Sequence, residues 1–243
     1  MKSFRKWLAL LMAGLLLCST LLACDSGSDW EEDDDDDDES ESSSQYKNLS
    51  PTELWDAILE AEDFTIVMEG VRKNDGETST AARTVFKNGD QLKLVNTSTY
   101  EDEESRTETA YYDLKENLFY EEEDGQWYCE QGDEDTTLTD LLDDVFPVDL
   151  LFSKDSYEED SENDVYSMKP DAIREEIDAP EEVDCEGKMT SKGSVYTFTF
   201  SASDDEHSIE YTVTVKFKSD TVKLPDAKPV KNEGEAFPDE DEW

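Results

Sequence analysis

The sequence predicts an α+β fold built on a large antiparallel sheet, and three observations lead to this prediction. A strongly capped helix opens the body of the chain near residue 50. Strand-like runs then follow one another with short turns between them, which favours an antiparallel meander. Near the end of the body, apolar and polar residues alternate over 209–217, the pattern of a sheet that is covered on one side only.

The first expected element is a helix from Ser50 to about Ala61. Ser50 suits the N-cap, Pro51 suits the first helical position, and Glu53 completes a capping box. The apolar residues of this segment form one stripe: Leu54, Trp55, Ile58 and Leu59. Because such a helix is amphipathic, we expect it to lie on an apolar surface.

A meander of about six strands should follow the helix. Asn88-Gly89 is the strongest hairpin signal in the chain, and Asn74-Asp75-Gly76 and Asp124-Gly125 supply further turns. The expected strands are 64–71, 82–87, 91–96, 109–114, 118–122 and 126–130.

The middle of the body is predicted to be helical and the end to return to strands. Thr137 to Asp140 resembles a second capping box, opening a helix over 137–145, and 170–177 is expected to be a short helix. Between them lie an apolar patch at 150–152 and an acidic loop at 155–164. The expected returning strands are 195–200, 209–217 and a short last one at 221–224.

The charge balance is strongly acidic and excludes one class of partner. The chain has 66 acidic and 21 basic residues among 243, a net charge of −45. Phosphate contacts need clustered Lys and Arg, so we expect no nucleic-acid partner. We expect residues 24–46, with the run Asp33 to Asp38, to be a disordered linker, and 228–243 to be a disordered acidic tail. The linker lacks the ligand spacing of a calcium loop, so any cation binding there would be diffuse.

The first 23 residues have the layout of an export signal. Lys2, Arg5 and Lys6 precede the apolar run from Trp7 to Leu17. That run is much shorter than the roughly 20 residues that a membrane-spanning helix needs.

The end of this segment, Leu21-Leu22-Ala23-Cys24, resembles the lipobox of bacterial lipoproteins. The resemblance implies cleavage before Cys24 and a diacylglyceryl group on its thiol. Two acyl chains are enough for stable anchoring, so we expect the mature protein to be tethered to the outer side of the plasma membrane. An ordinary signal peptide that is cut elsewhere is the alternative.

Residues 47–227 are expected to form one domain, and its order of elements resembles the bacterial lipoprotein-carrier superfamily. That group includes LolA-like carriers and the mycobacterial glycolipid-carrying lipoproteins. The resemblance rests on Tyr111-Tyr112-Asp113 leading through Leu118-Phe119-Tyr120 into Trp127-Tyr128, and on the ending Val222-Lys223-Leu224-Pro225. It implies a strongly curved sheet, or half-barrel, whose concave face is covered by helices and which binds acyl chains between sheet and helices.

If the sheet and the helices enclose a hollow, aromatic and apolar side chains should line it. The candidate cavity-lining residues are Trp55, Ile58, Tyr111, Phe119, Trp127, Phe198, Tyr211 and Val213. The alternative is that the same residues fill a packed core, as such residues more often do.

The residues that usually carry catalysis or bind metals are scarce. His207 is the only histidine, and no second residue is spaced with it as a catalytic pair or a zinc site. We therefore expect no enzyme activity, no metal and no cofactor. Cys129 and Cys185 permit one disulfide in an exported chain, and two separate buried thiols are the alternative.

The sequence thus favours a membrane-anchored, extracytoplasmic lipoprotein that binds a hydrophobic or amphiphilic ligand without catalysis. The alternative is a surface-displayed interaction or sensory domain with a packed core and no such ligand. A hollow or a filled space between the sheet and the helices would separate the two.

Overall fold

The fold was analysed in a computed structural model, which describes residues 45–74, 77–100, 105–123, 125–132, 136–158, 165–204 and 207–227. The predicted leader 1–23, the lipidation residue Cys24, most of the linker 24–46 and the tail 228–243 lie outside these residues.

In the described part of the chain, ten strands form one open antiparallel sheet, which confirms the predicted α+β class. The strands are β1 (Asp63–Asn74), β2 (Glu77–Asn88), β3 (Gln91–Tyr100), β4 (Arg106–Asp113), β5 (Leu118–Glu123), β6 (Gln126–Gln131), β7 (Val165–Ser167), β8 (Asp184–Lys192), β9 (Val195–Ser203) and β10 (His207–Lys216). Their order across the sheet is β6-β5-β4-β3-β2-β1-β10-β9-β8-β7. The predicted six-strand meander is therefore β1 to β6, and β10 returns to pair with β1.

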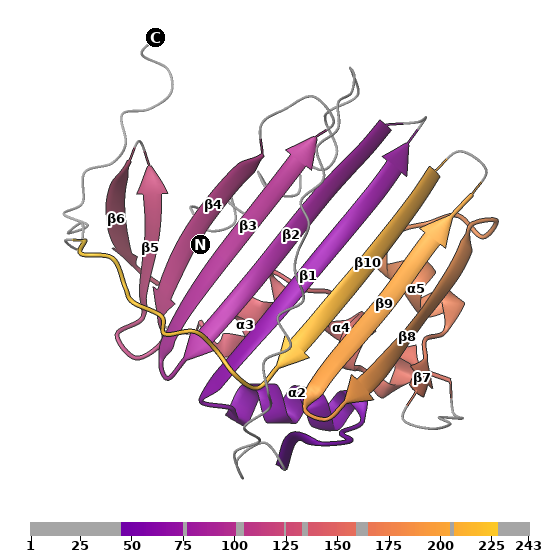
Figure 1. Cartoon of the computed structure of the whole chain (residues 1–243), viewed down its shortest axis with the longest axis horizontal. Coiled ribbons are helices and arrows are strands. Elements are labelled where there is room, and N and C mark those ends of the chain that lie inside the picture. The colour runs from indigo at the N-terminus through magenta and orange to yellow at the C-terminus, as the bar shows by residue number, and fades with distance from the viewer. Residues whose placement is uncertain are drawn as a thin grey trace.

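The helices form a second layer on one side of the sheet, with α2 across its lower end in Figure 1. They are α2 (Pro51–Glu60), α3 (Leu138–Asp143), α4 (Val148–Phe152) and α5 (Pro170–Glu176), with a short 3-10 helix, η2 (Lys154–Ser156). Both predicted capping boxes are present: Ser50 with Glu53 at α2, and Thr137 with Asp140 at α3.

The core lies between the helices and one face of the sheet, here called the helix-side face. The predicted alternation on β10 is confirmed, since Val213 and Val215 are fully buried against this layer. On β9, Tyr196, Phe198 and Phe200 are buried on the same face. The opposite face, here called the outer face, carries the residues between them.

The predicted last strand at 221–224 is wrong. Residues 218–227 have no regular secondary structure. β10 is already paired with β1 on one side and β9 on the other, so the chain after it has no free strand beside it. The segment instead crosses the ends of the strands toward β5 and β6 (Figure 1), and the Thr65 hydroxyl on the outer face donates to the Lys218 carbonyl at 2.8 Å.

Candidate functional site

The space between α2, α4 and the sheet is filled by side chains. Leu54 and Ile58 of α2, Leu151 of α4, and Phe198 and Val213 of the sheet have no exposed surface at all. A space that could hold one water molecule would leave exposed surface on the residues around it. No such space adjoins these five side chains.

Aromatic contacts close the same interface. The Trp55 ring stacks on Phe152 with centroids 4.9 Å apart, and Phe152 meets Phe198 edge to face at 5.3 Å. The three rings thus join α2, α4 and β9 by direct contact. This interface is a packed core at the described residues.

The predicted cavity-lining residues divide between the two faces of the sheet. Six of them belong to the core or pack against it: Trp55, Ile58, Phe119, Phe198, Tyr211 and Val213. Tyr111 and Trp127 contact each other edge to face at 5.3 Å on the outer face, away from the helices. Tyr211 is half-buried where the core gives way to a polar surface.

Cys129 and Cys185 are free thiols in the structure. Cys129 is on β6 and Cys185 is on β8, and seven strands lie between these two in the sheet. With neighbouring strands about 4.8 Å apart, the sulfur atoms are much too distant for a disulfide. The arrangement matches the alternative of two separate thiols.

The helix-side face becomes polar along its strands, away from α2. In β1 the inward residues change from Phe64 and Ile66 near α2 to Arg72 and Asn74 at the other end. In β2 the corresponding inward residues are Val85, then Arg83, then Ser79. Most of these polar positions are only partly buried, whereas the apolar ones are buried. We call this surface the far half of the helix-side face. It is formed by Arg72, Ser79, Arg83, Asn96, Ser98 and Tyr211, and it is bordered on β4 by Glu108 and Arg106, which pair with each other.

Arg83 lies at the inner border of the far half. Its Nη1 donates to the backbone carbonyl of Val145 at 3.1 Å, just after α3. Among the residues that the structure describes, no carboxylate forms an ion pair with Arg83. Burial lowers the pKa of the Arg83 guanidinium, and the Tyr211 hydroxyl acts in the opposite direction.

Tyr211 is held in place on both sides of its ring. One side stacks on Phe200 with centroids 5.0 Å apart. Gly70, its register partner on β1, lies so close that an added Cβ would be 2.5 Å from the ring. Burial raises the pKa of Tyr211, and the charges of Arg83 and Arg72 act against that rise. The hydroxyl is therefore protonated at neutral pH.

Sequence reasoning missed Arg72 and Arg83. A usable signal was present, because Arg83 is two residues from Val85 and so shares its inward face on β2. An inward-facing cation in so acidic a chain is unusual.

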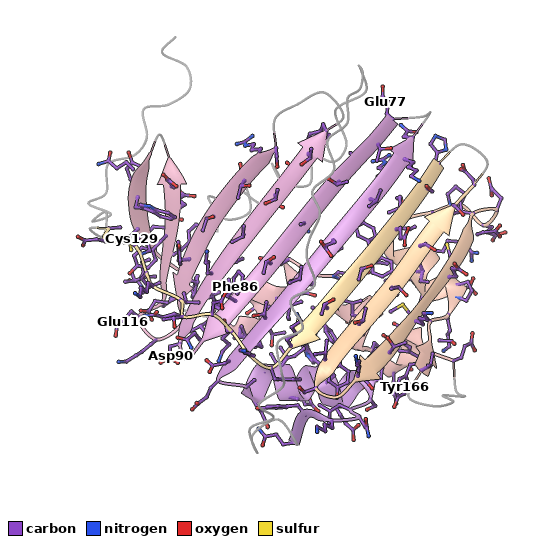
Figure 2. The ribbon with its side chains drawn as sticks, viewed as in Figure 1. Glu77, Phe86, Asp90, Glu116, Cys129 and Tyr166 are labelled. Atoms are coloured by element: carbon purple, nitrogen blue, oxygen red, sulfur yellow. The ribbon has the colours of Figure 1, made fainter. Side chains whose placement is uncertain are left out.

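The central part of the outer face carries mostly neutral side chains. Its charged residues include Glu69 on β1 and Lys93 on β3, whose Nζ lies 5.6 Å from the centroid of the Phe86 ring (Phe86 is labelled in Figure 2). One row across the central strands reads Thr109, Val95, Thr84, Val67 and Thr214. Threonine and valine are the residues most suited to an exposed strand. This row is therefore the expected composition of a solvated sheet face.

The described residues contain no other reactive group in a useful arrangement. His207 is exposed, and its Nδ1 lies 3.1 Å from Asp204. Burial raises the pKa of Glu176, and Asp149 and Asp143 add to the rise, yet no group of described residues could hold a metal ion.

Comparison with known proteins finds no family model that matches this chain and no curated protein with a matching sequence. The far half of the helix-side face is thus identified from its own geometry.

Proposed function

We propose that this protein is a lipid-anchored, extracytoplasmic and non-catalytic binding module that acts through the far half of the helix-side face. The anchor rests on Leu21-Leu22-Ala23-Cys24 and on the short apolar run before it. Among the described residues, no helix is long and apolar enough to cross a membrane. Attachment through Cys24 is compatible with that finding.

We also propose that the sheet curves around its helices as the half-barrel of the lipoprotein carriers does. An open sheet with helices on one side supports this part of the resemblance. The filled interface supports binding at the surface over binding of acyl chains inside.

The attachment point of the linker gives the module an orientation. Tyr46, at the start of the described chain, stacks on Phe217 just after β10, with centroids 3.8 Å apart. The buried Tyr196 hydroxyl donates to the Tyr46 carbonyl at 2.8 Å and accepts from the Leu49 amide at 2.9 Å. These contacts hold Tyr46, the last residue of the linker, at the α2 end of the sheet. In this proposal the far half of the helix-side face is therefore the part of the domain farther from the attachment point.

The observation that carries the proposal is the complete burial of Leu54, Ile58, Leu151, Phe198 and Val213. A hydrophobic-ligand carrier needs space beside such residues. Here the side chains themselves occupy it, which favours the packed interaction domain over the expected hollow.

A fluorescent fatty-acid probe tests this choice. We expect the delipidated protein to show no saturable uptake, whereas a known fatty-acid carrier under the same conditions does. Stoichiometric, saturable uptake that competes with unlabelled fatty acid would show a hollow and overturn the surface-binding proposal.

A further inference from the structure

Among the described residues, Arg83 has no acidic partner, although the chain has about three acids for each base. The described arginines Arg106 and Arg174 pair with Glu108 and Asp171, while Arg83 meets only the neutral carbonyl of Val145. Removing a cation from water without a counter-ion is costly. A site with this cost is suited to an anion that arrives with the ligand.

The guanidinium keeps donors available for such an anion. An arginine has five N–H donors in a planar fork, and the bond to Val145 uses one of them. Among the described residues, the only buried side-chain nitrogen or oxygen without a hydrogen bond is Nε of Arg174. The other guanidinium N–H groups of Arg83 are therefore not buried without a hydrogen bond.

Tyr211 adds a second donor in a fixed position. Phe200 on one side and Gly70 on the other restrict its ring, and its protonated hydroxyl can donate. The Tyr211 ring lies over Gly70 of β1, whose partner on β2 is Ala81, two residues from Arg83 on the same face. The hydroxyl and the guanidinium therefore lie at the same part of the far half of the helix-side face. A guanidinium fork beside a fixed hydroxyl is complementary to a carboxylate or a phosphate group.

We propose that Arg83 and Tyr211 form an anion subsite that binds a carboxylate or phosphate group of the ligand. This inference rests on the proposed function, because it names the chemistry of a ligand for the far half of the helix-side face. Arg72 lies on the same surface, two residues from Gly70 along β1.

The test is a titration of the purified full chain with sodium acetate and, separately, with sodium phosphate at constant ionic strength. Arginine Nε–Hε signals in NMR spectra report binding at individual side chains, with NaCl as the ionic-strength control. We expect saturable shifts of the Arg83 signal, and the tighter of the two anions identifies carboxylate or phosphate as the preferred group.

Three variants separate the subsite from a structural role of Arg83. In R83Q the affinity for the preferred anion, followed by backbone amide signals, should fall about tenfold or more, and in Y211F it should fall about threefold. R83K keeps the charge and one donor to Val145 but loses the fork, so its anion affinity should lie between those of the wild type and R83Q. If R83Q fails to fold, R83K still tests the subsite through an affinity below that of the wild type. K93Q is the matched control, because Lys93 is a partly exposed cation on the outer face, over the Phe86 ring; its affinity should equal that of the wild type.

Two results would overturn the subsite. One is a wild-type response no different from that to NaCl, and the other is equal anion affinity in the wild type, R83K and Y211F. Neither result bears on probe uptake or on the lipid anchor, so the failure of the subsite and the failure of the proposed function are distinguishable.

Discussion

Gly70 illustrates how one residue fixes the geometry of the candidate site. Its backbone lies against the Tyr211 ring, where a Cβ would be 2.5 Å from Cε1 and 2.8 Å from Cδ1. No side chain fits this space unless the ring moves. The absence of a side chain at residue 70 therefore sets where the Tyr211 hydroxyl lies.

We predict that G70A destabilises the fold by about 1–3 kcal/mol, because the added methyl group overpacks the ring. In a Y211A background the same change should cost less than about 1 kcal/mol. Urea unfolding of the wild type, G70A, Y211A and the double variant measures the coupling free energy between the two residues. Equal costs in both backgrounds would show that Tyr211 is not the obstacle.

Tyr120 gives the fold a defined sensitivity to alkali. It lies opposite Cys129 in the β5–β6 pair, and both are buried. Burial, with the neighbouring Cys129, raises the pKa of Tyr120 to about 12 from 10.0. Since the folded pKa exceeds the unfolded one, this contribution to stability is complete below pH 10 and is lost as the pH rises from 10 to 12.

We expect Y120F to be less stable than the wild type at pH 8 by about 0.5–1.5 kcal/mol, through loss of the contact with Cys129. Between pH 10 and 12, however, its stability should fall less steeply. Denaturant unfolding at pH 8, 10 and 11 gives both quantities. Parallel curves for the two proteins would contradict the assignment to Tyr120.

At the scale of elements, α2 is the helix whose local sequence explains it best. The Ser50 side chain accepts from the Glu53 amide, and the Glu53 carboxylate accepts from Ser50. These hydrogen bonds from Ser50 lower the pKa of Glu53 below 4.5. A lowered carboxyl pKa means stability that is present above pH 4.5 and lost as the pH falls through the folded pKa.

S50A should cost about 0.5–2 kcal/mol at pH 7, since α2 covers the core through Leu54 and Ile58. The difference from the wild type should shrink below pH 4.5, where Glu53 becomes protonated in both proteins. The matched control is S194A in the β8–β9 turn, which should change stability by less than about 0.5 kcal/mol. A constant S50A deficit from pH 7 to pH 3 would contradict the role of Glu53.

Elements with strong local signals could be predicted from the sequence, and those that depend on tertiary contacts could not. The capping boxes and the Asn88-Gly89 hairpin were correctly predicted. Helix α4 was missed because four of its five residues are buried, so no amphipathic pattern marks it, and Pro147 gives no side-chain cap. The short β7 was missed as well, because three residues carry almost no periodicity.

The order of the strands across the whole sheet determines the features that could not be predicted from the sequence. Pairing of β1 with β10 places the C-terminal strands beside the first one and sends β6 and β8 toward opposite edges. That pairing separates Cys129 from Cys185.

Alternation assigned faces correctly within β9 and β10, but it could not show that Tyr111 and Trp127 lie on the face opposite Phe119. The candidate site depends on this global order, since it joins Arg83 of β2 to Tyr211 of β10 across β1.

The net charge of −45 should dominate the response of the whole molecule to salt. The ion pairs of the described residues are few and involve exposed partners, so salt removes little attraction. Screening of repulsion acts on every acid, because the Debye length falls from about 30 Å at 0.01 M to about 8 Å at 0.15 M. We predict that Tm rises by several degrees over this range of NaCl in scanning calorimetry. A lower Tm in the higher salt would mean that specific attractions outweigh the repulsion.

The lipid anchor is the claim on which orientation and proposed function both depend, and metabolic labelling with an alkyne-bearing palmitate tests it most directly. The chain contains its own control, because Cys18 lies six residues before Cys24 within the predicted leader. We expect a labelled, processed protein in the membrane fraction for the wild type and for C18S, and no label for C24S. Label that persists in C24S, or wild-type chain recovered unprocessed and unlabelled, would contradict this expectation.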